Sequence, residues 1–202
     1  MWSLTTGVKI ILEGQGLVKI NIIGTSGSGK TTFARKLAES LSLPFLEMDA
    51  VFWGPDWTFP EDKELYSKLT SALDGENWVL DGNYTRTIPI KWDNIDIVIW
   101  LDFSFLRTLF QAVTRAFTRI LTREEFWPGT GNRETLGKLF SRDSIVLWTL
   151  KTYRRNRKKF AGYMEADEFK EIHFIRLESP RQAKIFLQKA SRNQDLIFDR
   201  IN

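Results

Sequence analysis

The sequence contains no cysteine and a single histidine. Without cysteine the chain can form neither a disulfide nor a thiol-based catalytic centre, and one histidine gives no basis for an imidazole metal site. That histidine, His173, lies in the apolar run IHFIRL, where a structural role is favoured over a catalytic one. The lack of cysteine agrees with a cytoplasmic protein, which we expect here.

Long apolar runs are also absent. None approaches the ~18 residues that a transmembrane helix needs, so we expect no spanning segment and no membrane partner. The N-terminus lacks a basic stretch followed by a long apolar one, which predicts no signal peptide. A chain of 202 residues suits one domain with a mobile lid. Residues 1–17 carry no motif and are expected to be an extension, either poorly ordered or forming an edge strand around Val8–Leu12.

Charge of both signs is present but unevenly placed. Residues 103–160 hold 13 lysines and arginines against 4 acidic residues, a net charge of +9 within a chain whose total is +4. Such a block suits polyphosphate, nucleic acid or simply solvent, and the charge alone does not choose among them.

One motif says most about the chemistry. Residues 24–32 read GTSGSGKTT and fit G-x-x-x-x-G-K-[ST], the phosphate-binding loop of nucleoside-triphosphate enzymes. Small residues let backbone N–H groups line a nest around a phosphate, Lys30 adds charge for the outer phosphates, and the Thr31 hydroxyl suits Mg²⁺. The predicted nucleotide-binding residues here are Gly24, Thr25, Ser26, Gly27, Ser28, Gly29, Lys30, Thr31 and Thr32.

The surroundings of the motif support it. Lys19–Ile23 is an apolar, β-branched run that predicts a buried strand, and apolar residues at helical spacing follow Lys30 until Pro44. The loop therefore lies between a strand and a helix, where the helix N-terminus attracts an anion.

The rest of the chain alternates in the same way. Trp78–Leu80, Ile95–Leu101 and Ile172–Leu177 predict further strands, as does Phe45–Val51, in which Asp49 lies near the end. Helices are expected from a Thr58/Glu61 capping box, at 105–121, at 139–165 and at 180–190. This order indicates an α/β fold, a parallel sheet with helices on both faces. Ligands bind such sheets at the carboxyl ends of the strands, where the loop, Asp49, Asp81-Gly82 and Asp102 fall.

The arrangement resembles the adenylate-kinase-like and shikimate-kinase-like P-loop kinases. More narrowly it is similar to the adenylate-kinase-related proteins often labelled DNA topology modulation proteins, through GTSGSGKTT, MDAVFWGPDWT, WVLDGNYTRT, DIVIWLDFS and WTLKTYRRNRKK. The resemblance implies a P-loop domain over residues 18–202 with strand order 2-3-1-4-5. It further implies an acceptor-binding segment at about 50–77 and a helical lid at about 115–140.

The same resemblance implies roles for single residues. Asp81 would hold Mg²⁺ through water, unless it only initiates the turn at Gly82. Arg115 and Arg119, four apart on one helix face, would stabilise the transferring phosphoryl group of ATP, although Gln111 stands where the first of two lid arginines is expected. Further candidates for the nucleotide are Arg123 and Arg133 beside the lid loop, and Pro180 and Arg181 beside adenine.

The kind of acceptor is indicated by Asp49 and by the segment around it. In kinases that phosphorylate a hydroxyl, a carboxylate near this position binds or deprotonates the acceptor, whereas here Asp49 alternatively only caps a turn. Residues 45–75 contain seven acidic residues and no arginine, which disfavours a phosphate-bearing acceptor unless Arg86 and Lys91 reach it. Trp53 and Trp57 either line the acceptor pocket or pack together.

The leading interpretation is therefore an ATP-dependent, Mg²⁺-dependent kinase of a small hydroxyl-bearing molecule or nucleotide. The alternative is a nucleic-acid-associated ATPase that contacts DNA through the basic helix at 142–159. A GTPase is disfavoured because the guanine motif N-K-x-D is absent. The oligomeric state is left open.

Overall fold

The structure, a computed structural model, describes residues 18–127, 129–135 and 144–192. Five strands form one sheet, namely β1 (Lys19–Gly24), β2 (Phe45–Glu47), β3 (Trp78–Asp81), β4 (Ile97–Leu101) and β5 (His173–Leu177). Their order is β2-β3-β1-β4-β5 and all neighbours run parallel, which confirms the predicted fold class and strand order. Strands β3 and β4 are buried throughout because both faces of the sheet are covered.

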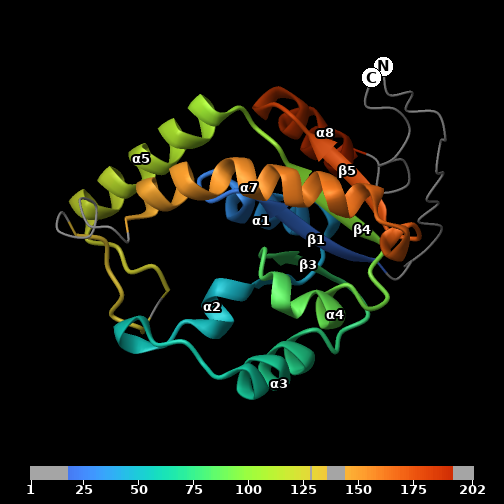
Figure 1. Ribbon diagram of the computed structural model, residues 1–202, viewed down its shortest axis with the longest axis horizontal. Coiled ribbons are helices and arrows are strands. Elements are labelled where there is room, and N and C mark those ends of the chain that lie inside the picture. The colour runs from blue at the N-terminus through green and yellow to red at the C-terminus, as the bar shows by residue number, and fades with distance from the viewer. Residues whose placement is uncertain (1–17, 128, 136–143, 193–202) are drawn as a thin grey trace.

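Helices cover the two faces as expected (Figure 1). On one face α1 (Lys30–Leu41) and α8 (Pro180–Arg192) enclose a core of strand residues such as Ile22 and Ile99. On the other face lie α2 (Met48–Phe52), α3 (Asp62–Ala72), α4 (Ile88–Lys91) and α7 (Ile145–Glu165), whose Phe160 packs against Trp100.

Helix α5 (Phe105–Thr122) follows β4 and packs beside α7. Figure 1 shows the chain after α5 descending as an irregular loop toward α2 and the segment before α3. Short 3-10 turns at Pro55–Trp57, Thr85–Thr87 and Asp167–Phe169 complete the described part. The predicted extension 1–17 and the first residues of the helix predicted at 139–165 lie outside it.

Two local predictions were wrong. The strand predicted at Phe45–Val51 ends at Glu47, and Asp49 lies in α2, because turning into a helix buries both Met48 and Phe52 beneath the sheet. Helix α3 begins at Asp62 without a side-chain cap. Its predicted cap, Thr58, instead donates its hydroxyl to the carbonyl of Pro55, at 2.8 Å.

Among the described helices, none combines the length and the apolar character that crossing a bilayer would require.

Candidate active site

The phosphate loop lies between β1 and α1 and is backed by α5. Gly27 and Gly29 both have φ of 86°, a left-handed conformation that favours glycine. Gly27 has a second constraint, because a Cβ there would stand 2.8 Å from both the Ala112 Cβ and the Thr108 carbonyl oxygen. The hydroxyl of Ser28 is buried and has no partner among the described residues, as suits a loop shaped around a ligand.

Two asparagines fix the loop to the neighbouring strand. Gly24 donates its N–H to Asn83 Oδ1 at 3.0 Å and accepts from Asn83 Nδ2 at 2.5 Å. Asn21, fully buried within β1, donates to the carbonyls of Leu80 and Gly82 at 3.0 and 3.2 Å. The sequence analysis missed both residues, although a polar residue inside the apolar run KINII was a usable signal.

Two further buried side chains, Trp92 and Lys91, stabilise the turn at Gly82 through hydrogen bonds. Trp92 Nε1 donates to Asn21 Oδ1 at 2.9 Å, and the ammonium of Lys91 donates to the Gly82 carbonyl at 3.1 Å. Lys91 is 1% exposed, and burial, followed by repulsion from Lys159, lowers its pKa to about 7. Lys91 therefore supports the turn from below and is not an acceptor-binding cation.

Lys30, Thr31 and Asp81 meet at the end of β3. The Thr31 hydroxyl donates to Asp81 Oδ2 at 2.5 Å, and Lys30 Nζ lies 3.4 Å from the Thr25 carbonyl. Burial raises the pKa of Asp81, and the Lys30 ammonium opposes that rise. The other carboxylate oxygen, Oδ1, is buried with no partner among the described residues, so a hydroxyl and a free carboxylate oxygen stand together as oxygen ligands that Mg²⁺ prefers.

Asp49 and Arg115 join this cluster from two other elements. Asp49 accepts the Tyr84 hydroxyl at 2.5 Å, and this carboxylate together with burial raises the pKa of Tyr84. Burial lowers the pKa of Lys30, while Asp81 and Asp49 act against that change electrostatically. Burial likewise lowers the pKa of Arg115, whose guanidinium lies 3.5 Å from the Ser26 hydroxyl. The fold thus brings these predicted catalytic residues into one electrostatic group.

A cluster of aromatic side chains lies next to this group and contacts it through Glu47. Trp53 stacks on Trp127 with ring centres 6.0 Å apart and 8° between planes, and Trp57 meets Phe126 edge to face at 4.9 Å. Trp127 Nε1 also points to Glu47 Oε1 at 3.4 Å. Trp53 and Trp57 therefore pack together, which was one of the two predicted alternatives. They also pack against the loop after α5, a contact that the sequence did not predict.

Asn132 ties the same loop to the segment before α3. Its side-chain amide donates to the Gly54 carbonyl at 2.9 Å, and the Trp57 N–H donates to its Oδ1 at 3.0 Å. Asn132 is buried although it belongs to an irregular loop. The described residues 126, 127 and 129–132 thus pack as one body with residues 53–59, in the segment predicted to bind the acceptor.

The remaining predicted nucleotide ligands lie further out. The guanidinium of Arg119 stands 4.0 Å from the centre of the Phe126 ring, and Arg133 pairs with Glu125 at 3.2 Å. Arg123 is exposed at the C-terminal end of α5, as are Pro180 and Arg181 at the start of α8. None of these five is brought against the phosphate loop by a described contact, so their roles toward ATP stay predictions.

Other charges near the sheet edge are already paired. Asp102 accepts from Arg157 at 3.0 Å and from Arg176 at 2.9 Å. Arg86 pairs with Asp62 at 2.7 Å. Part of the basic helix α7 therefore serves the fold itself.

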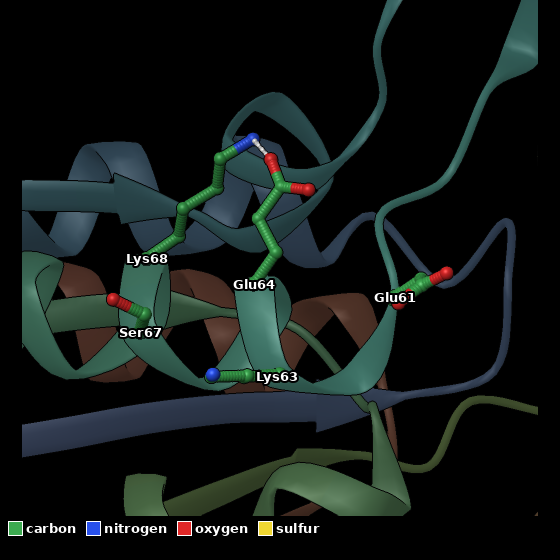
Figure 2. Close-up of a pocket in the computed structure, with 5 residues that line it drawn as sticks. All are labelled: Glu61, Lys63, Glu64, Ser67 and Lys68. Carbon is green, nitrogen blue, oxygen red and sulfur yellow. Dashed lines mark ion pairs between the residues drawn. The ribbon is translucent and has the colours of Figure 1, made fainter.

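A pocket of about 400 Å³ lies apart from this site, over the first turns of α3 (Figure 2). It is lined by exposed polar side chains whose charges compensate, with Lys68 and Glu64 paired at 2.8 Å. We assign it no role in the chemistry. Its lining residues are Glu61, Lys63, Glu64, Ser67 and Lys68.

No protein-family model and no curated protein sequence matches this chain. Among solved structures, the chain is similar to a gluconokinase from Sinorhizobium meliloti, with 16% identity, a TM-score of 0.47, and 86% of this chain and 89% of that chain covered. It is also similar to a shikimate kinase from Acinetobacter baumannii in complex with shikimate, with 18% identity and a TM-score of 0.49, over 87% of this chain and 91% of that chain. A sugar kinase from Janibacter sp. is similar with 20% identity and a TM-score of 0.48, over 92% of this chain and 100% of that chain. All three carry the names of small-molecule kinases, but at these values the reaction of this chain must be argued from its own residues.

Proposed function

We propose that this chain is an ATP-dependent phosphotransferase that phosphorylates a hydroxyl group of a small molecule. The observation that carries the proposal is the convergence of Lys30, Asp81, Asp49 and Arg115, from four separate elements, on one group beside the phosphate loop. Lys30 and Arg115 would supply positive charge to a transferring phosphoryl group, and Asp81 and Asp49 add two carboxylates to the same group of side chains.

On the donor side, the loop and the first turn of α1 offer backbone N–H groups that have no partner within the helix. Thr31 and Asp81 are the residues that would hold Mg²⁺, which neutralises phosphate charge when bound. Lys30 would then bind the outer phosphates, and Arg115 would face the transferring phosphoryl group from α5.

On the acceptor side, Asp49 would take the proton of the attacking hydroxyl. The acceptor oxygen forms the new bond to the γ-phosphorus, the bond from that phosphorus to the bridging oxygen breaks, and ADP leaves with the electron pair. Tyr84 orients the Asp49 carboxylate by its hydrogen bond. Asp49 acts as the base or as a ligand of the hydroxyl, and both roles require the carboxylate.

The charge around Asp49 favours an acceptor without a phosphate or carboxylate group. Glu47 lies beside it with a pKa raised by burial and by Asp81, and Arg86 and Lys91 are engaged elsewhere. An anionic acceptor would meet Asp49 where Arg35 is already paired with Glu47 at 3.7 Å and Arg115 is assigned to the transferring phosphoryl group. Neutral or cationic polyols, sugars and nucleosides fit better.

The test is acceptor-dependent release of ADP by the purified chain with ATP and Mg²⁺. We expect release with a member of a panel of sugars, polyols, amino alcohols and nucleosides, and none with the matching phosphorylated compounds. The proposal fails if every acceptor leaves ADP release unchanged while duplex DNA stimulates it, since that result would favour the nucleic-acid-associated ATPase.

A further inference from the structure

Helix α5 turns a narrow face of small residues inward. Thr108, Ala112 and Ala116 are buried, with Thr108 and Ala112 against Gly27, and Arg115 lies near Ser26. The opposite face carries Leu106, Phe110, Phe117 and Leu121, which are 75%, 64%, 47% and 82% exposed. Their spacings of four, seven and four residues place them in one stripe along the helix.

Exposed apolar side chains are concentrated in this region of the molecule. Among the described residues, the large hydrophobic side chains most exposed to solvent lie on α5 and α7, with a single exception, Ile185 on α8. Exposed apolar side chains gathered in this way, above all in the stripe along α5, mark an interaction site, because scattered single exposures would be expected otherwise. The exposed set on the two helices is Leu106, Phe110, Phe117, Leu121, Trp148, Leu150 and Met164.

The same two helices carry only positive charge until the last residue of α7. Neither contains an acidic residue before Glu165. Exposed Lys151 and Arg154 line, with Phe105 and Leu150, one pocket of about 350 Å³ where α7 meets the first turn of α5. Cationic and apolar side chains therefore lie next to each other on this surface.

We propose that this α5–α7 surface docks on an anionic phospholipid bilayer. The stripe of α5 would insert between the headgroups, and the lysines and arginines would contact the headgroup anions. This replaces the expectation of no membrane partner, which rested on the lack of a spanning segment. A helix that lies at the membrane surface needs an apolar face and a basic border, and it does not have to be long enough to cross the bilayer.

Charge and side-chain chemistry favour the bilayer over two other occupants. A second copy of this chain would bring an equally basic helix pair against the first, and like charges repel. Nucleic acid would match the charge but gains nothing from Leu106 and Leu121, whose aliphatic side chains cannot stack on bases as aromatic ones do. A bilayer uses both kinds of side chain.

The test is co-sedimentation of the full chain with vesicles of phosphatidylcholine alone or mixed with phosphatidylserine. We expect binding only to the mixed vesicles, weaker at high ionic strength. The double variant Phe110→Ser/Phe117→Ser should lose more than about tenfold in affinity. Lys151→Gln and Arg154→Gln should each lose up to about fivefold. Ile185→Ser, on the opposite face of the sheet, is the matched control and should bind as the parent does.

Four outcomes overturn the proposal. The mixed vesicles fail to bind the folded parent chain, or Phe110→Ser/Phe117→Ser binds them as well as the parent does. Alternatively, sedimentation without lipid shows a dimer that this variant abolishes, which assigns the stripe to a second copy. Duplex DNA bound equally by parent and double variant, without vesicle binding, assigns the surface to nucleic acid. Equal thermal unfolding of parent and variants excludes misfolding as the cause.

Discussion

The donor side and the acceptor side of the site are held together by different forces. Around the phosphate loop, the buried Asn21 and Lys91 and the half-buried Asn83 bind backbone carbonyls and an amide at the ends of adjacent strands. Over the acceptor side, two irregular segments meet through aromatic rings and one bridging asparagine, Asn132. Directional bonds to a sheet fix a geometry, whereas ring packing between loops tolerates exchange of side chains. We infer that the donor side is rigid and that the acceptor side sets specificity.

The largest effect should come from the donor side. Lys30→Ala should lower acceptor-dependent turnover about a hundred- to a thousandfold, because the charge on the transferring phosphoryl group loses a preorganised cation. Lys36→Ala, exposed on the same helix, is the control and should keep parental turnover. Steady-state ADP release measures the effect, and circular dichroism verifies that both variants fold. Parental turnover in Lys30→Ala would remove the donor side from the chemistry.

The substitution Asp49→Asn should affect the acceptor side and leave the donor side intact. Transfer should fall about a hundredfold if the carboxylate takes the proton, while the Kd for ATP should stay nearly unchanged. Asp56→Asn tests the same substitution in the same segment at an exposed residue with positive φ, which asparagine tolerates. Single-turnover transfer and calorimetric ATP titration distinguish the outcomes. A variant that loses ATP affinity and transfer together would place Asp49 on the donor side.

Lys91, which supports the donor side, should make the free energy of unfolding depend on pH. Burial lowers the pKa of Lys91 in the folded chain to about 7 from the model-compound value of 10.5. Between these values the unfolded chain binds more protons, so the free energy of unfolding rises with pH. Relative to Lys91→Met, the parent should gain roughly 2 kcal/mol from pH 7 to pH 9. Urea unfolding at both pH values measures this difference, and an equal pH response of both proteins would contradict it.

The same contrast explains what the sequence could predict. The strands and the phosphate loop depend on local patterns, and the meeting of Lys30, Thr31 and Asp81 follows from parallel strands ending at one edge. Contacts across the acceptor side have no such pattern, since Asn132 meets Trp57 across 75 residues and Trp127 meets Glu47 across 80. The helix at Asp49 was missed because burial of Met48 and Phe52, a tertiary effect, overrides strand propensity.

The smallest expected effect concerns Arg133, which the sequence predicted as a phosphate contact. In the structure its guanidinium pairs with Glu125, and both belong to the loop that packs on the acceptor segment. An exposed pair of this kind contributes little, so Arg133→Gln should change the Kd for ATP less than about twofold. Arg115→Gln, at a half-buried guanidinium beside the phosphate loop, should weaken ATP binding at least about tenfold. The reverse order in an ATP titration would show that the loop moves to the donor side when ATP binds, and that the two sides act as one.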